Sequence, residues 1–286
     1  KAFMLKQRIL TALVLLAILL PALFYPDPAA FAGVVLVLMA GAAWEWGRLN
    51  GCSFAASLAL SAVCVALCAA AWLAGWAAQP LTLLWILAAG VWVLGSAWLL
   101  RAGVPGWPRI PRALRLVLGV LGLWLAWLAV VQARVIGINF LLSVMTLVWM
   151  ADIAAYFAGR SFGLRFTKNK LAPSISPGKS WEGVWGGMAG VLLLGLCWIV
   201  ADARWEAAVP SLYSRLWAQG AWLLLLGALF MACMSVVGDL IESLVKRSAG
   251  AKDSSNLLPG HGGVLDRVDA LLPTLPIAMM LTRLVS

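Results

Sequence analysis

The sequence has few charged residues, a single histidine and no paired cysteine motif. Only 11% of its 286 residues are Asp, Glu, Lys or Arg, and 64% are hydrophobic, whereas soluble domains average about 25% charged residues. The five cysteines lie within or beside apolar runs, and none forms a CxxC pair. The shortage of charge argues against a water-soluble fold, and the cysteine placement argues against a disulfide framework or a zinc site.

The net charge of +10 comes from basic residues in short gaps between apolar runs. Basic groups in that arrangement are typical of membrane-orientation signals and of sites that bind anionic phosphates. We therefore expect membrane lipid and phosphate-bearing partners, and no nucleic acid.

Apolar runs dominate the chain. A membrane-spanning helix needs about 20 mostly apolar residues, whereas barrel strands are shorter and alternate. The sequence therefore predicts an all-α, polytopic integral membrane protein with about nine transmembrane helices. The predicted spans are 8–25, 29–46, 53–77, 80–100, 114–132, 138–158, 184–201, 217–238 and 265–285.

The distribution of Lys and Arg predicts the orientation. With the N-terminus inside, the outer segments hold only Arg134, Arg204, Arg215 and Arg283, and all other Lys and Arg residues fall inside. The positive-inside rule then places the N-terminus in the cytoplasm and the C-terminus outside. We expect a bacterial inner (cytoplasmic) membrane location, with the active site facing the cytoplasm.

Polar residues divide the chain near residue 100. We expect residues 1–100 to form N-terminal transmembrane helices that act as a lipid-facing scaffold. Residues 101–286 are predicted to form a catalytic transmembrane region with cytoplasmic loops at 159–183 and 239–264.

One segment, 235–269, gathers ionisable residues that are costly near lipid unless they have a function. It holds five of the eleven carboxylates, namely Asp239, Glu242, Asp253, Asp266 and Asp269. Two carboxylates without an exclusive partner suit Mg²⁺ together with phosphate oxygens. We expect Asp239 and Asp266, each at the start of a helix, to meet and to ligate Mg²⁺. Asp269 is an additional candidate, and a second cation remains an open alternative.

The same segment carries a specific resemblance. From Ser243 it reads S-L-V-K-R, then four residues, then K-D-S-S-N-L-L-P-G-H-G-G-V-L-D-R-V-D. This resembles the signature of the phosphatidate cytidylyltransferases, also called CDP-diacylglycerol synthases. Two upstream pieces are also similar to that family, Asp152-x-x-Ala-Tyr-Phe-x-Gly-Arg160 and Ser174-Ile-Ser-Pro-x-Lys-Ser-x-Glu-Gly183.

The resemblance implies an enzyme that converts CTP and phosphatidic acid to CDP-diacylglycerol and pyrophosphate with Mg²⁺, for phospholipid biosynthesis. The oligomeric state stays open, with a homodimer as one alternative. The implied catalytic residues are Asp239, Asp266, Asp269, Lys246, Arg247 and His261, and Asp239 and Asp266 are the implied metal ligands. The implied substrate-binding residues are Asp152, Arg160, Ser176, Lys179, Glu182, Lys252, Asp253, Gly262, Gly263 and Arg267.

Several of these residues have a simpler alternative role. Asp152 either contributes to the site or only pairs with Arg160, and Glu242 and Lys246 either act in the site or form a helical salt bridge. Lys246 and Arg247 could equally face acidic headgroups. His261 serves either as a general acid for the leaving pyrophosphate, or as a hydrogen-bond donor to phosphate, or only to shape its turn.

Two other functions remain open. One is a CTP-dependent lipid kinase acting on polyprenols, which would release CDP rather than pyrophosphate. The other is a transporter of cations or phosphates, which would use intramembrane carboxylates. The complete HGG-containing motif favours cytidylyl transfer over the kinase, and the predicted clustering of charge on one face of the membrane argues against the transporter.

Overall fold

The structure is a computed structural model that describes residues 2–285, with side chains from residue 7 onward. Within that range, eight helices are long and apolar enough to cross a membrane. The prediction of an all-α, polytopic membrane protein is therefore confirmed. The eight helices are α1 (Ala2–Phe24), α2 (Pro28–Leu49), α3 (Phe54–Leu73), α4 (Thr82–Ala102), α5 (Arg112–Ile136), α6 (Ile138–Phe162), α7 (Trp181–Arg204) and α9 (Ala221–Ser248).

The predicted ninth span, 265–285, is interrupted. It consists of the short helix α10 (Leu265–Val268) and the 14-residue helix α11 (Leu271–Leu284), which contains Pro276. A helix of 14 residues is about 21 Å long, shorter than the roughly 30 Å hydrocarbon core of a bilayer. The count of nine spanning helices is not confirmed, because the helix in this last segment is buried and too short to span the membrane as a single continuous helix.

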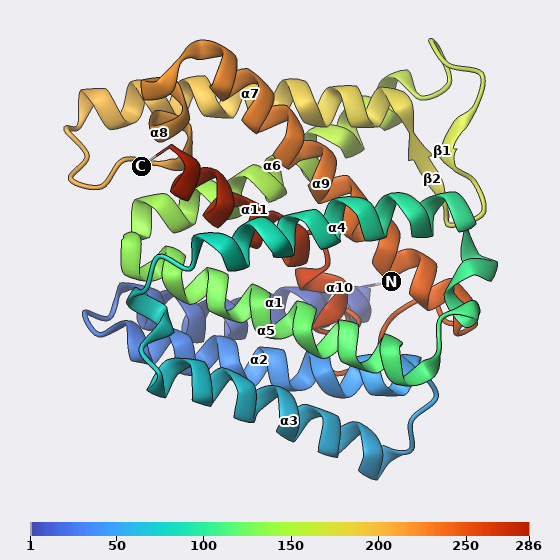
Figure 1. Cartoon of the computed structure of the whole chain (residues 1–286). Coiled ribbons are helices and arrows are strands. Elements are labelled where there is room, and N and C mark those ends of the chain that lie inside the picture. The colour runs from blue at the N-terminus through green and yellow to red at the C-terminus, as the bar shows by residue number, and fades with distance from the viewer. Residues whose placement is uncertain (1, 286) are drawn as a thin grey trace.

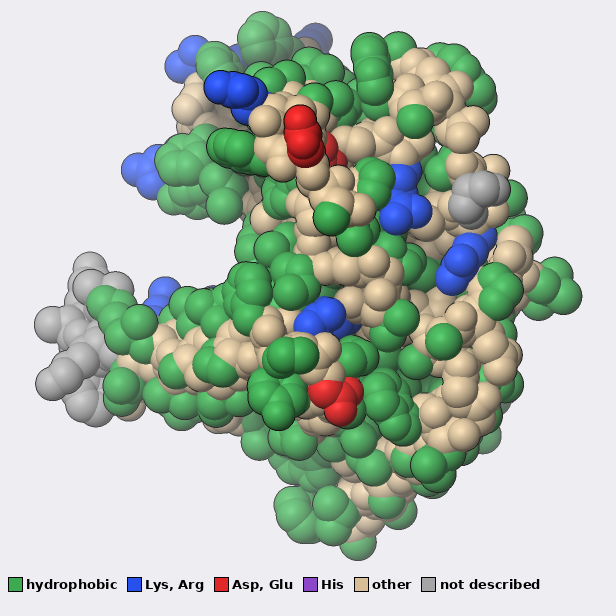
Figure 2. Space-filling model, turned by 90° about the vertical axis from the view of Figure 1, so that its left-hand side faces the viewer, with side chains coloured by type: hydrophobic (Ala, Val, Ile, Leu, Met, Phe, Trp, Pro, Cys, Tyr) green, Lys and Arg blue, Asp and Glu red, His purple; other side chains and the backbone are tan. Residues whose placement is uncertain are grey.

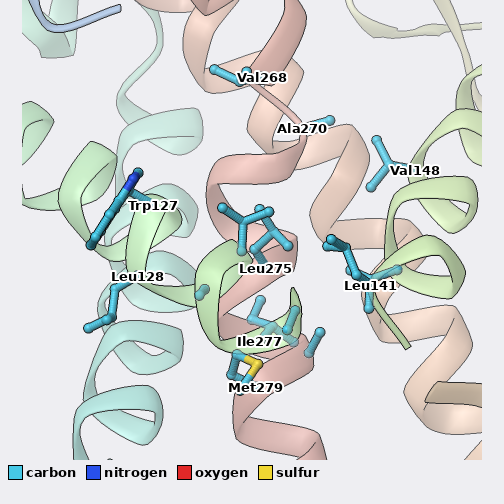
Figure 3. Packing of buried hydrophobic residues seen from close by; sticks show 14 of the residues in the cluster. Trp127, Leu128, Leu141, Val148, Val268, Ala270, Leu275, Ile277 and Met279 are labelled. Atoms are coloured by element: carbon cyan, nitrogen blue, oxygen red, sulfur yellow. The ribbon is translucent and has the colours of Figure 1, made fainter. Parts of the chain in front are cut away.

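Helix α11 lies inside the bundle. Its side chains Leu275, Ile277 and Met279 point into a core that also contains Trp127 of α5 and Leu141 of α6 (Figure 3). All of these residues are at most 2% exposed. The outer helices show the opposite pattern, since α1 leaves a series of large apolar side chains exposed, as expected for a helix in contact with lipid.

Five shorter elements lie between the long helices. They are two 3₁₀ turns, η1 (Trp76–Ala78) and η2 (Val104–Arg109), the helix α8 (Leu212–Gln219), and an antiparallel hairpin of β1 (Lys170–Ala172) and β2 (Ser176–Ser180). The hairpin lies in the segment predicted as the loop 159–183. The predicted loop 239–264 is also shorter than expected, because α9 remains helical to Ser248.

Helix-capping residues explain several of the boundaries. Asp27 accepts a hydrogen bond from the Ala29 amide at the start of α2, and Ser53 accepts one from the Ala56 amide at the start of α3. Ser180 caps α7 by accepting from the Gly183 amide. Such side chains satisfy amides that have no partner within the first turn of a helix.

The long helices run side by side between two ends of the molecule (Figure 1). The β1–β2 hairpin, η2 and the C-terminal end of α9 gather at the right-hand end in that view, and α11 ends at the left. The left-hand end carries mainly apolar side chains with scattered charged ones, and it is hollowed on one side between two lobes (Figure 2). The polar motifs therefore lie at the end opposite this apolar face.

Helices α6 and α7 pack closely along their lengths. A Cβ on Gly186 would lie 2.1 Å from the Ala158 Cβ, and one on Gly190 would lie 2.6 Å from the Ala154 Cβ. Small residues spaced four apart allow two helices to approach closely in a membrane. This contact places the C-terminal turns of α6 beside the start of α7.

Candidate active site

A cavity of about 590 Å³ opens where α6, β2, α7 and α9 meet. It lies next to the close contact between α6 and α7, and both polar segments of the sequence contribute to it. Its lining residues are Asp152, Ala155, Tyr156, Gly159, Arg160, Gly178, Lys179, Ser180, Gly183, Val184, Val236 and Asp239. Four predicted site residues, Asp152, Arg160, Lys179 and Asp239, are therefore brought together.

Lys179 and Asp239 form an ion pair across this cavity. The Lys179 Nζ lies 2.5 Å from Asp239 Oδ2, and the two side chains are 24% and 31% exposed. Asp239 Oδ1 accepts a hydrogen bond of 3.2 Å from the Ser243 hydroxyl. The expectation that Asp239 opens a helix without an exclusive partner is wrong, because it lies within α9 and pairs with a lysine 60 residues earlier in the chain.

Arg160 and Asp152 occupy the same cavity in different ways. The Arg160 Nη1 donates to the Tyr156 hydroxyl over 3.0 Å, one helical turn away. Within the described residues, Asp152 makes no ion pair with Arg160, so the alternative that these two residues pair is not supported. Asp152 instead lies within electrostatic range of Asp239 and Lys179.

A second polar cluster lies about two turns further along α9. Lys246 forms ion pairs with Glu242 on the same helix and with Asp266 on α10, where the Nζ to Oδ1 distance is 2.6 Å. The Lys246 side chain is 12% exposed, and the two carboxylate side chains are 5% exposed. Glu242–Lys246 is therefore a helical salt bridge, but it also extends across to Asp266.

Asp266 is held by the loop that precedes it. Its Oδ2 accepts hydrogen bonds from the Ser254 amide, the Ser254 hydroxyl and the Gly263 amide, at 2.9, 2.9 and 2.8 Å. Burial alone would raise the pKa of Asp266, but these bonds and the one from Lys246 outweigh it and lower the pKa to about 2. The carboxylate is thus a stable anion, and the expectation that Asp266 has no exclusive partner is also wrong.

Asp269 lies between the two clusters. It is within electrostatic range of Asp239, Lys246 and Asp152. Gly238 permits this placement, because a Cβ there would lie 2.5 Å from the Asp269 carbonyl oxygen and 2.9 Å from Pro273 Cγ. The absence of a side chain next to Asp239 therefore lets α9 approach the segment that carries Asp269.

We predict that Gly238→Ala lowers both stability and turnover. The added methyl group would force α9 away from Asp269, and overpacking of this kind costs about 1–3 kcal/mol. Gly33→Ala on α2 is the matched control, because a Cβ there meets nothing within 4 Å. Thermal unfolding in detergent should show a lower Tm for Gly238→Ala alone, and equal Tm values for the two variants would contradict the proposed close approach.

Comparison with known proteins gives the family. A sequence profile of the cytidylyltransferase family matches residues 6–285. This chain belongs to the cytidylyltransferase family. A relative from Pseudomonas aeruginosa, named phosphatidate cytidylyltransferase, is 44% identical over 281 residues, which cover 96% of this chain and 95% of that protein. A protein of the same name from Haemophilus influenzae is 37% identical over 297 residues and covers 96% of each chain.

The match is not confined to the motifs. A shorter match, of 150 residues at 38% identity, joins about half of this cytidylyltransferase to a phosphatidate cytidylyltransferase from Bacillus subtilis. The matches to the Pseudomonas aeruginosa and Haemophilus influenzae proteins cover nearly the whole chain, including the N-terminal helices. The resemblance seen in the motifs between Asp152 and Asp269 is therefore confirmed, and the similarity extends beyond them.

Other residues predicted for this cytidylyltransferase site lie outside the cavity lining. Glu182 is buried at 3% exposure and accepts bonds from the Phe166 and Thr167 amides and the Thr167 hydroxyl. It therefore anchors the chain before β1, and its predicted role in substrate binding is not supported. Within the part of the chain that the structure describes, Arg247 makes only long contacts, to the Ile175 and Ala251 carbonyl groups at 3.4 and 3.5 Å.

The remaining predicted residues lie on or near the loop 249–264 and at the hairpin. His261 donates its amide to Leu258 at 2.8 Å in a tight turn, which agrees with a role in shaping that turn. Its Nδ1 atom is buried and has no partner among the described residues. Four other predicted residues are Ser176 at the start of β2 and the exposed Lys252, Asp253 and Arg267. Their side chains make no ion pair or hydrogen bond with another residue within 2–285. Gly262 and Gly263 complete the turn beside Asp266.

The predicted metal site was tested against the donor atoms that the structure brings together. Within the described residues, no three His, Cys, Asp or Glu side chains lie close enough to form a complete metal site. Mg²⁺ usually binds through one or two carboxylates and completes its shell with substrate phosphates and water. Asp269 fits that requirement, whereas Asp239 fits it once Lys179 turns away and Asp266 once Lys246 turns away.

Two residues of the site were not predicted. Tyr156 lies in a quoted motif but was given no role, although it lines the cavity and accepts from Arg160. Glu45 on α2 was assigned to the scaffold region, but it contacts the loop that holds Asp266. Its sequence signal was its isolation, because it is the only carboxylate between Asp27 and Asp152.

Proposed function

We propose that this chain transfers the cytidylyl group of CTP to phosphatidic acid, giving CDP-diacylglycerol and pyrophosphate. The observation that carries the proposal is the full-length similarity to proteins named phosphatidate cytidylyltransferase. The cavity supports it, because cationic and carboxylate side chains face one another at a polar end of an apolar helix bundle.

The chemistry asks the protein to position two anions rather than to generate a nucleophile. A phosphate oxygen of phosphatidic acid attacks the α-phosphorus of CTP, and the bond to the β-phosphate breaks to release pyrophosphate. The nucleophile is already anionic, so positioning and charge neutralisation supply most of the acceleration. We assign Lys179 and Arg160 to the CTP phosphates, because both line the cavity and Arg160 is oriented by Tyr156.

Lys246 is assigned to the same task from the other cluster. Its ammonium group lies between the Glu242 and Asp266 carboxylates and within electrostatic range of Asp269. Both Lys179 and Lys246 neutralise a carboxylate in the structure. We propose that each lysine turns from its carboxylate to a phosphate when nucleotide binds.

We further propose that Asp239 and Asp266 hold Mg²⁺, with Asp269 as an additional ligand and a second cation as an alternative. When bound, the ion would neutralise charge on the α-phosphate and on the leaving pyrophosphate. The carboxylates then need no lysine to balance their charge, which agrees with the lysine movement proposed above.

The experiment is an assay of purified protein with CTP, Mg²⁺ and phosphatidic acid. We expect CDP-diacylglycerol and pyrophosphate in equal amounts. Release of CDP with a phosphorylated lipid would indicate the kinase alternative. Movement of cations or phosphate into proteoliposomes without CTP would indicate the transporter.

We propose that the protein is embedded in a bacterial inner membrane with the hairpin end in the cytoplasm. The basic residues at that end and the bacterial sources of the relatives support this placement. A homodimer stays a prediction, which light scattering in detergent would measure.

The orientation predicts opposite labelling of two exposed alanines, in a background without native cysteines. Ala249→Cys, just after α9, should react with an impermeant thiol reagent only from the cytoplasmic side. Ala208→Cys, between α7 and α8, should react only from outside. Labelling of both positions from the same side would contradict the proposed topology.

A further inference from the structure

Glu45 is a fully buried carboxylate on one of the N-terminal helices. It lies near the end of α2 and has 0% exposure. Its Oε1 accepts from the Ser255 hydroxyl at 2.5 Å and the Val264 amide at 2.9 Å. Its Oε2 accepts from the Leu265 amide at 2.8 Å and the Ser254 hydroxyl at 3.1 Å. All four donors belong to the segment 254–265, more than 200 residues later in the chain.

The same segment holds Asp266. The Ser254 hydroxyl lies within hydrogen-bond distance of both Glu45 Oε2 and Asp266 Oδ2, and the Ser254 amide also donates to Asp266. The segment is folded tightly around both carboxylates, because a Cβ on Gly263 would lie 2.0 Å from Ser254 Oγ and 2.4 Å from Glu45 Oε1. Glu45 is thus joined through one serine to the residue that pairs with Lys246.

No ion pair compensates Glu45 within the described residues. A buried anion without a cation must be stabilised by hydrogen bonds to its charged form. Here two consecutive amides each donate to a different carboxylate oxygen, and a hydroxyl group adds to each side. A buried charge is a costly way to attach α2 to the segment 254–265, because an apolar residue of similar size would pack there without the desolvation cost.

Helix α1 holds the same loop from another direction. The Arg8 Nε donates to the Gly260 carbonyl oxygen at 2.8 Å, and the Thr11 hydroxyl donates to the Pro259 carbonyl oxygen at 2.9 Å. The N-terminal helices therefore contact the loop at both its tip and its end. Their contribution to the site is more specific than the predicted lipid-facing scaffold.

We propose that Glu45 is a positioning residue for the transfer reaction, and the inference rests on the proposed function. It fixes the segment 254–265 so that Asp266 and Lys246 keep the geometry needed to receive the metal and the phosphates. Glu45 touches neither the substrate nor the reacting atoms. It acts by reducing the number of arrangements that the loop can adopt before the substrates bind.

Glutamine cannot replace Glu45 in this arrangement. An amide side chain has one oxygen and one NH₂ group. Whichever way the side chain is turned, its NH₂ group would face either the Val264 or the Leu265 amide. Two hydrogen-bond donors would then face each other with no acceptor between them. Aspartate keeps the charge and both acceptor oxygens but is shorter by one methylene group, so it should restore the contacts only in part.

The test compares Glu45→Gln and Glu45→Asp with a matched control, Asp202→Asn. Asp202 also collects hydrogen bonds from an amide and side chains, namely Asn139, Ser211 and Ser214. It lies at the far end of α7, about 30 Å along the helix from Glu182. Each purified variant is assayed for kcat and for KM with CTP and phosphatidic acid. Amide hydrogen exchange of the peptide covering 253–265 is measured without substrate.

We expect Glu45→Gln to lower kcat by about 10- to 100-fold, with a smaller change in either KM, because misplacement of a catalytic group by about 1 Å has an effect of that size. Exchange in 253–265 should become faster, since its amides lose their acceptor. Glu45→Asp should fall between Glu45→Gln and the unaltered protein in both measurements. Asp202→Asn should leave kcat and the exchange of this peptide unchanged.

Two results would overturn the inference. One is a Glu45→Gln protein with kcat within about twofold of the unaltered enzyme. The other is a large loss of kcat with no change of exchange in 253–265. If Glu45→Gln does not fold, Ser255→Ala removes one donor to Glu45, together with the acceptor of the Leu257 amide, and should still lower kcat and speed exchange at the Val264 and Leu265 amides. The exchange measurement does not depend on activity, so failure of the proposed function would appear separately, as absence of product from the unaltered protein.

Discussion

Replacement of Asp239 by asparagine is expected to reduce turnover at least about 100-fold, the size of effect seen when a group that stabilises transition-state charge is lost. Asparagine keeps the shape of the side chain and can still accept from Ser243, but it carries no charge. Lys179 then loses its partner in the cavity, and the proposed cation loses a ligand. We expect kcat to fall more than either KM, because the charge matters most as pyrophosphate leaves.

The matched control is Asp27→Asn. Asp27 undergoes the same change of charge, but it lies at the start of α2 and not in the cavity. Asparagine caps a helix as well as aspartate does. Both variants should have a Tm close to that of the unaltered protein. The turnover of each variant is then measured as a function of Mg²⁺ concentration. Higher Mg²⁺ would partly restore turnover if the substitution weakens the metal site, and would not restore it if the substitution only removes an electrostatic contact. Near-normal turnover of Asp239→Asn at ordinary Mg²⁺ would remove Asp239 from the site.

The sequence predicted the parts of this site that depend on local composition. Each long helix corresponds to an apolar run long enough to span a bilayer, so eight of the nine predicted spans are found. The last segment differs because its charged start, which holds Asp266 and Asp269, is separated from α11 by a break between Val268 and Leu271, and because α11 contains Pro276. The β1–β2 hairpin was missed because its strands are short, polar and without alternating apolar residues.

The pairings within the site could not be predicted in the same way. Lys179–Asp239 and Lys246–Asp266 depend on which helices are neighbours, and no periodicity in the sequence specifies that. Glu45 shows the difference most clearly. A lone carboxylate in an apolar run needs a partner, but no prediction was made for Glu45, because its four donors lie at the other end of the chain. Sequence reasoning therefore identified charged residues more reliably than their contacts.

Lys246→Met is expected to be the most destabilising of the substitutions considered. Lys246 is the cation shared by Glu242 and Asp266, whose side chains are 5% exposed. Methionine preserves much of the length and apolar volume of lysine and removes the charge. Two carboxylates would then remain buried without a counterion, and removal of one partner from a buried ion pair costs about 3–5 kcal/mol. For a chain of this size that corresponds to a fall in Tm of roughly 10 °C.

Arg247→Met is the control for this loss of stability. Arg247 is the next residue on α9 and carries the same charge, but it is exposed, and its contacts to the described residues are long. Its replacement should change the Tm by no more than about 2 °C, as is usual for surface substitutions. The double variant Glu242→Gln/Lys246→Met should recover part of the lost stability, because Asp266 retains its bonds from Ser254 and Gly263. Equal Tm values for Lys246→Met and Arg247→Met would show that the shared lysine does not stabilise the fold, and the two carboxylates would then have to be protonated or hydrated.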